Sequence, residues 1–270
     1  MRYIIFLFLF SYSSIKAQKP INELGLFLGG SYYIGDLNQT HFNQTKPAFG
    51  LLYRVNSNEG RLALRLHFMY GTVGAYDSKS KDEFIQNRNL HFRSRIFELG
   101  PSVEINYMKY KFGDMKTHVG TAYILLGLTY FRMNPQAELN DGWIDLQPLG
   151  TEGQETAQNR NSRYKQNQIS IPVGLGLKWN LNDRFAMSVE YGIRKTFTDY
   201  LDDVSGYYVN PAQLAVDNGL LSAQYSDPSS GDVNNIGRLR GNPSNKDWYT
   251  FCGIILSYRL KKATTCHSWR

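Results

Sequence analysis

The feature that most constrains this chain is a strict alternation in residues 168–181, which read QISIPVGLGLKWNL. Apolar side chains occupy every second position from Ile169 to Leu181, and small or polar residues fill the positions between them. This is the period of a β-strand, whose successive side chains point to opposite faces. Seven further segments show the same alternation: 24–32, 49–55, 62–70, 97–107, 122–130, 185–193 and 248–260. Eight is an even number, as a closed bacterial barrel requires.

The connections between these segments alternate in length. Short connections are 56–61, 109–116 and 181–184, and long ones are 36–46, 78–89, 134–167 and about 205–247. Short turns at one end and long loops at the other are typical of outer-membrane barrels. We therefore predict an all-β protein over residues 18–260: an eight-stranded antiparallel transmembrane β-barrel with short periplasmic turns, long extracellular loops and both termini in the periplasm.

The two ends of the chain have compositions of their own. Arg2 precedes an unbroken apolar run over 3–10, and small residues lead to a plausible cut before Gln18. This pattern predicts a cleaved signal peptide over residues 1–17 and hence export to the cell outer membrane. Residues 261–270 follow the last strand as a short periplasmic tail. The two cysteines, Cys252 and Cys266, do not form a disulfide framework, and we expect both to be free.

Aromatic residues identify the solvent on the apolar side of the predicted wall. They form two groups by depth, one near the periplasmic strand ends (Tyr53, Tyr107, Trp179, Tyr258) and one near the opposite ends (Tyr32, Tyr70, Tyr130, Trp248). Two aromatic belts are expected of a lipid-facing wall, because amphipathic rings favour the headgroup level. The alternative, a soluble calycin-like barrel, holds its apolar residues inside and has no need of belts. The belts favour outer-membrane lipids as the surroundings.

The opposite register carries charged residues in equal numbers of each sign: Glu23, Glu98, Glu104 and Glu190 against Arg54, Arg65, Lys178 and Arg194. A charge inside a narrow barrel must pair or stay hydrated, because an unpaired buried ion is costly. Eight strands leave an interior just wide enough for side chains. We therefore expect a plugged polar lumen and no channel for small-molecule substrates.

Candidates for catalysis are few. His41 and His91 lie in long loops that also hold Asp36, Asp77 and Asp199, so a base and an orienting acid could meet at the rim. Three acids in residues 196–211 could supply oxygen ligands to calcium, although regular ligand spacing is missing. No CxxC, HExxH or nucleotide-binding glycine loop is present. We favour solvated loop residues and turn-capping acids, and predict a non-enzyme with no cofactor and no metal.

Basic residues are concentrated at the periplasmic end. The net charge of +7 could suggest nucleic acid, but the cations are scattered along the chain and an exported protein seldom meets that partner. At the short turns and in the tail they outnumber Glu59, Asp114 and Asp183: Arg61, Lys109, Lys111, Lys116, Arg184, Lys261, Lys262 and Arg270. This basic collar could bind anionic lipid headgroups or dock a periplasmic protein.

Two stretches carry a family resemblance: ELGLFLGGSYYIGDLN at 23–38 and EYGIRKTFTDYLDDVSGYYVNP at 190–211. They resemble small outer-membrane barrels of Bacteroidetes, a family that includes PorG, the barrel component of the type IX secretion apparatus. The shared positions form what we call the rim motif: Gly35, Asp36, Thr198, Asp199, Tyr200, Asp202 and Asp203.

The resemblance implies a non-catalytic barrel whose periplasmic side associates with a ring. That ring is built from a lipoprotein of the PorK or GldK type and a subunit of the PorN or GldN type. Two alternatives remain open. One is a stand-alone structural or adhesive barrel of the OmpA or OmpX kind, and the other is a rim hydrolase or lipid-modifying barrel.

Overall fold

The computed structural model describes residues 20–139, 142–229 and 234–260. The predicted signal peptide and the tail, with Lys261, Lys262 and Arg270, lie outside these residues. The strands are β1 (Ile21–Ile34), β2 (Lys46–Asn56), β3 (Leu62–Tyr76), β4 (His91–Asn106), β5 (Gly120–Gly127), β6 (Thr129–Arg132), β7 (Pro135–Leu139), β8 (Gly142–Asp145), β9 (Asn167–Asn180), β10 (Phe185–Thr196) and β11 (Trp248–Arg259). The helices are η1 (Asp77–Lys79), α1 (Glu83–Arg88), α2 (Pro211–Asn218) and α3 (Leu220–Ser226).

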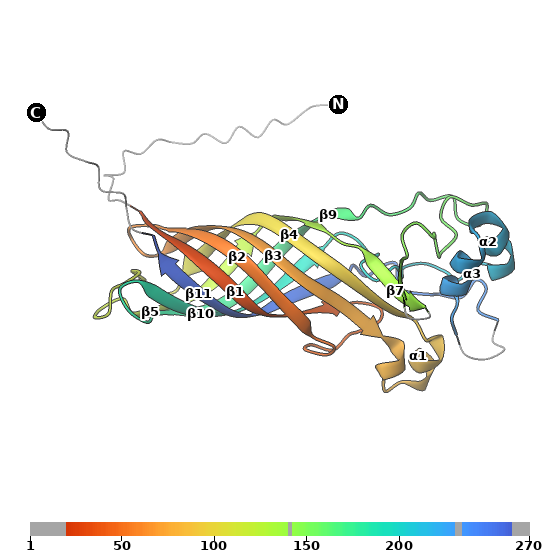
Figure 1. Ribbon diagram of the computed structural model, residues 1–270, viewed down its shortest axis with the longest axis horizontal. Helices are drawn as coiled ribbons and strands as arrows, with labels where there is room; N and C mark the ends of the chain where they lie inside the picture. Colours follow the sequence, from red (N-terminus) through yellow and green to blue (C-terminus); the bar gives the residue numbers. More distant parts are fainter. Residues whose placement is uncertain (1–19, 140–141, 230–233, 261–270) are drawn as a thin grey trace, which may run out of the picture.

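The strands close into an antiparallel barrel with eight positions around its wall, which we call staves (Figure 1). Seven staves are single strands, and the eighth consists of two strands in line. β5 and β6 form one stave interrupted at Leu128, because both pair with β4 on one side and β9 on the other. The ring closes where β1 pairs with β11, from Glu23 opposite Arg259 to Ile34 opposite Trp248. The predicted eight-stranded antiparallel barrel is confirmed.

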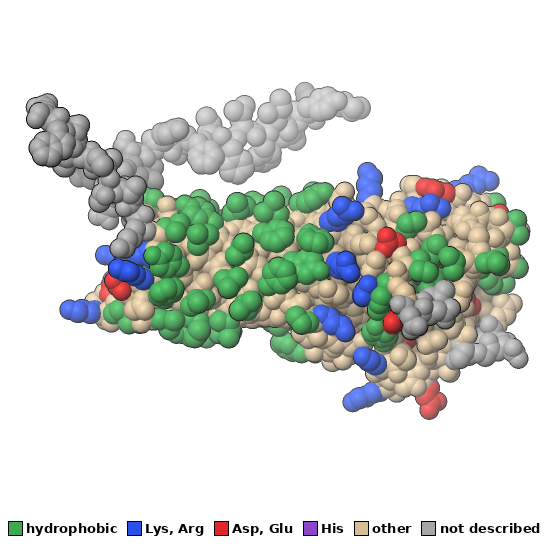
Figure 2. Space-filling model, in the orientation of Figure 1, with side chains coloured by type: hydrophobic (Ala, Val, Ile, Leu, Met, Phe, Trp, Pro, Cys, Tyr) green, Lys and Arg blue, Asp and Glu red, His purple; other side chains and the backbone are tan. Residues whose placement is uncertain are grey.

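The outer wall is apolar through its middle and charged at its two ends (Figure 2). Side chains of the predicted apolar register are exposed along the staves, including Leu126 at 52% and Leu175 at 63%. Exposed apolar side chains on every stave would be unfavourable in water, whereas hydrocarbon solvates them. The wall therefore has the surface of a lipid-facing barrel.

One member of the predicted outer aromatic belt is covered. Tyr32 points outward but has an exposed fraction of 0%, because the loop after β1 folds back over the wall. The Tyr32 hydroxyl lies 3.1 Å from Nδ1 of His41 and 2.7 Å from the hydroxyl of Tyr191, and the Phe42 ring packs against both tyrosines. The placement of Tyr32 against lipid was therefore wrong, since strand periodicity contains no information about a loop that folds over the outside.

The interior has two zones. The half nearer the short turns holds most of the charged side chains, whereas the half nearer the long loops holds an apolar cluster that includes Phe27, Met69, Ile96, Phe131, Tyr249 and Phe251. The Glu98–Arg194 ion pair lies against this cluster, where it contacts Tyr249 and Phe251. The expectation of a plugged polar lumen did not include this apolar cluster. These residues occupy the same inward register as the charges, so both zones follow from one alternation.

The long loops form a folded cap at one end of the barrel, made of the described residues within 35–45, 77–90, 133–166 and 197–247 (Figure 1). The cap contains η1, α1, the β7–β8 hairpin, α2 and α3, so the expectation of plain loops there was incomplete. Asn210 caps α2 by accepting from the amide of Ala212, and Pro211 begins the helix, where its missing amide costs nothing. In the described part of the chain, helices long and apolar enough to cross a membrane are absent.

Candidate functional site

The interior charges form a connected network centred on Glu104. Its Oε1 accepts from Nε of Arg54 at 2.9 Å and lies 3.4 Å from Nη1 of Arg65, and its Oε2 accepts from Nζ of Lys178 at 2.7 Å. All four side chains are at most 1% exposed. One carboxylate therefore compensates three cations that come from three other staves.

The remaining interior charges complete two groups. In the first, Arg54 bonds Glu23 at 2.7 Å, and Glu190 accepts from Arg65 at 3.0 Å and from the Tyr123 hydroxyl at 2.7 Å. In the second, Glu98 accepts from Nε of Arg194 at 3.1 Å, from the Tyr249 hydroxyl at 2.7 Å, and lies 2.9 Å from Nε2 of His67. The structure thus places all eight residues that the inward register singled out in ion pairs, six in the first group and two in the second.

A short turn closes the barrel mouth below this network. The β4–β5 turn, residues 107–119, buries Tyr110 and Phe112 against Ala186. The Tyr110 hydroxyl donates to Oδ1 of Asn180 at 2.7 Å, and Nδ2 of Asn180 donates to the carbonyls of Lys111 and Asp114 at 2.9 Å. The turn is therefore a rigid plug. The sequence alone gave no indication that this turn folds inward.

The described part of the basic collar lies on and beside this plug. Lys109, Lys111 and Lys116 are exposed, and within the described residues none of them forms an ion pair. The nearby Asp114 accepts from the amides of Lys116 and Thr117 and from the Thr117 hydroxyl, and these bonds lower the pKa of its carboxyl. Arg61 donates to the carbonyl of Tyr107. Asp114 thus acts within the turn, and the collar presents free ammonium groups.

The rim motif lies at the opposite end, inside the cap. The Tyr33 hydroxyl bonds Asp202 at 2.5 Å and Asp247 at 3.0 Å, and Asp247 also accepts from the amide of Leu201. A phenol has only one proton to donate, so the second contact requires a protonated carboxyl. Burial raises the pKa of both aspartates well above the usual range, and their proximity raises that of Asp247 further. Gly35 belongs here because a Cβ at this position would collide with Tyr33 and Asp247.

The other acids of the rim motif also bind cap groups. Asp203 accepts from the hydroxyls of Thr151 at 2.5 Å and Tyr164 at 2.6 Å, while Asp199 accepts from the Ser205 hydroxyl at 2.6 Å. Burial raises the pKa of each of these two carboxyls to about 6.

The remaining members of the motif join strands and loops. Asp36 accepts from the amide of Asn242, and the Thr198 hydroxyl accepts from the amide of Tyr200. The motif therefore joins the β1 and β10 loops to the segment before β11.

The candidate catalytic residues are not brought together. His41 lies on the outer wall against Tyr32 and Tyr191, whereas Nε2 of His91 meets the backbone of Glu138 inside the cap. Across the residues that the structure describes, no three side chains of His, Cys, Asp or Glu are placed to hold a metal. The rim acids serve instead as acceptors for cap hydroxyls and amides.

Several solved structures are similar to this chain. The attachment invasion locus protein Ail of Yersinia pestis, solved with the heparin analogue sucrose octasulfate, is 10% identical with a TM-score of 0.42, over 90% of this chain and 100% of that one. Neisserial surface protein A is 7% identical with a TM-score of 0.44, over 88% and 97%. OprG from Pseudomonas aeruginosa is 12% identical with a TM-score of 0.35, over 89% and 98%.

Sequence comparison points to one family. Among curated proteins, none matches this sequence. A family model described as a domain of unknown function, DUF6089, matches residues 1–268. Because this match covers nearly the whole chain, the protein belongs to the DUF6089 family.

Proposed function

We propose that this protein is a non-catalytic outer-membrane barrel whose short-turn end docks a periplasmic ring of the type IX secretion apparatus. The apolar wall supports the membrane location, since exposed apolar side chains on all staves need a hydrocarbon solvent. The interior supports a scaffold role, because paired charges and buried aromatic rings occupy it.

The observation that carries the docking proposal is the collar on its rigid plug. Three lysines lie on a turn whose backbone is fixed by Asn180 and by two buried rings, so the backbone positions of these lysines are defined before any partner binds. A fixed backbone reduces the entropic cost of association, and clustered cations raise its rate with an acidic partner. The resemblance to the PorG-containing family supports a ring lipoprotein and its associated subunit as that partner.

Co-purification from detergent extracts tests the proposal. Reversing Lys109, Lys111 and Lys116 to Glu should sharply reduce recovery of the ring subunits, and added salt should weaken the unmodified complex. The matched control reverses three exposed cap lysines, Lys81, Lys165 and Lys246, and should leave recovery unchanged.

Other outcomes identify the alternatives. Unchanged recovery after collar reversal, with altered retention of anionic lipid, would assign the collar to headgroup binding. Absence of any ring subunit in the unmodified extract would favour a stand-alone structural or adhesive barrel and overturn the secretion role.

A further inference from the structure

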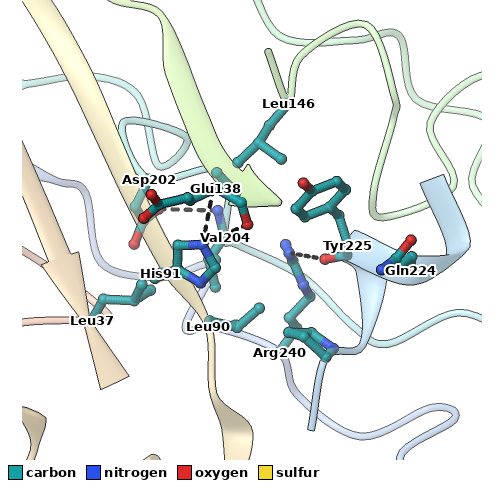
Figure 3. Close-up of a pocket in the computed structure, with 12 residues that line it drawn as sticks. Leu37, Leu90, His91, Glu138, Leu146, Asp202, Val204, Gln224, Tyr225 and Arg240 are labelled. Atoms are coloured by element: carbon teal, nitrogen blue, oxygen red, sulfur yellow. Dashed lines mark hydrogen bonds between the residues drawn. The ribbon is translucent and has the colours of Figure 1, made fainter. Parts of the chain in front are cut away.

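A small cavity lies inside the cap, at the opposite end of the barrel from the collar (Figure 3). Its volume is about 170 Å³, and its walls come from the start of β4, from β7, from α3 and from the loops after β1 and β10. Apolar side chains form most of the lining, including Leu37, Leu90, Leu146 and Val204. The cavity therefore depends on the folded cap as a whole.

One polar group in this cavity lacks a partner. Tyr225 on α3 has an exposed fraction of only 6%, and among the described residues its hydroxyl finds no hydrogen-bond partner. Two other buried tyrosines are satisfied, since Tyr33 at the end of β1 and Tyr164 in the cap donate to aspartates. In Figure 3 the Tyr225 hydroxyl points into the space framed by Leu146, Val204 and Leu90. A buried hydroxyl without a partner is unfavourable, so it indicates a missing group.

The backbone around Tyr225 is held in place. Nη2 of Arg240 donates to the carbonyl of Tyr225 at 3.3 Å, and Nε donates to the carbonyl of Ser226 at 3.1 Å. The Tyr225 ring packs with Ala137 and Leu146. These contacts fix the direction of the hydroxyl, so the bond it lacks must come from an occupant of the cavity.

The lining limits the charge of that occupant. Arg240 is already paired with Glu152 at 3.3 Å, so it offers no free positive charge to an anion. The Asp202 carboxyl is occupied by the Tyr33 hydroxyl and by the amide of Val204, and Nε2 of His91 meets the Glu138 backbone. Glu138 and Gln224 also line the cavity, but both residues are exposed to solvent. Among the described lining residues, the buried free hydrogen-bonding capacity therefore lies in the Tyr225 hydroxyl. An occupant that fits is therefore neutral and mostly apolar.

The volume limits its size. An engineered apolar cavity of about 150 Å³ binds benzene, so about 170 Å³ accommodates a single ring with a small substituent. We propose that the cap is a binding site for a small neutral ring compound with one hydroxyl or carbonyl group, which bonds the Tyr225 hydroxyl. This site is independent of the secretion role.

Fluorine NMR with two probes tests the site. The mature barrel, refolded in detergent micelles, is titrated with 4-fluorophenol and with fluorobenzene, with empty micelles as the background. The unmodified protein should bind 4-fluorophenol saturably. Tyr225→Phe should weaken 4-fluorophenol binding about tenfold, the value of one hydrogen bond, and leave fluorobenzene unchanged. Ala137→Leu, which fills the cavity, should abolish binding of both probes.

Controls separate specific binding from partitioning. Tyr207→Phe changes an exposed cap tyrosine and should bind like the unmodified protein, and heat-modified electrophoretic mobility verifies that each variant is folded. Titrations that match empty micelles would overturn the proposal and leave the cavity to water. Equal 4-fluorophenol affinity in the unmodified protein and Tyr225→Phe would overturn the assignment of the hydroxyl.

Discussion

Glu104 is the position where one substitution should cost the barrel most. Its carboxylate faces Arg54, Arg65 and Lys178, and the other two acids of this group are Glu23 and Glu190. Glu104→Gln changes a balance of three cations and three anions to three against two among buried side chains. Breaking a buried pair by removing one partner typically costs about 3–5 kcal/mol, because it leaves an uncompensated charge.

A second substitution distinguishes lost charge balance from lost packing. Lys178→Met in the Glu104→Gln background restores two cations against two anions, and should recover about 2 kcal/mol or more of the loss. The assay is urea unfolding of the barrel refolded in lipid vesicles, followed by tryptophan fluorescence and electrophoretic mobility. A cost below about 1 kcal/mol for Glu104→Gln would refute the reasoning, since it would mean that water reaches these charges. A double variant as unstable as the sum of the singles would refute it as well.

Three further results are expected. Because the interior is filled and the β4–β5 turn closes the mouth, the purified barrel should give no ohmic conductance in planar bilayers, and steady large steps would contradict this. Leu126→Arg should destabilise the barrel by about 2–4 kcal/mol in the unfolding assay, because it places a charge against lipid. Val216→Arg, on the exposed surface of the cap, should change stability by less than about 0.5 kcal/mol. Equal costs would mean that the wall does not face lipid. Asp199 and Asp203 bind protons more tightly in the folded cap than in the unfolded chain, so cap stability should fall as pH rises from about 4 to about 6. Hydrogen exchange of cap amides, corrected for intrinsic exchange, measures this. Greater amide protection at pH 7 than at pH 4.5 would contradict it.

The sequence was sufficient to predict the wall because a strand has only two faces. The alternation of Ile169, Ile171 and Val173 fixes which side chains point outward, and the same parity places Lys178 inside. The two-residue period is a local property, so no long-range information was needed. The eight strands and the inward charges could therefore be predicted from the sequence alone.

The contacts between side chains within the barrel and the cap could not be predicted in this way. Which cations meet Glu104 depends on the stagger between staves, and the stagger is set by the closed ring. The partners of Asp203, namely Thr151 and Tyr164, lie about 40–50 residues away in another loop. The loop that covers Tyr32 contacts the outer face of the wall at two staves, β1 and β10, through His41 and Phe42. In each case the contact joins segments that lie far apart in the sequence, and the alternation of side chains along a strand does not show which distant segments meet.

The seam between β1 and β11 determines when the interior charges are enclosed. It joins the first described strand to the last, so it is the pairing with the greatest sequence separation in the ring. Such non-local pairings form slowly, because chain entropy is lost before the contacts compensate for it. Until the seam forms, the edge of β1 that carries Glu23 is not paired with β11, and the charged interior is open to water. Barrel closure and expulsion of this water should therefore be one late step, whose rate depends on the inner charges more than on any single hairpin.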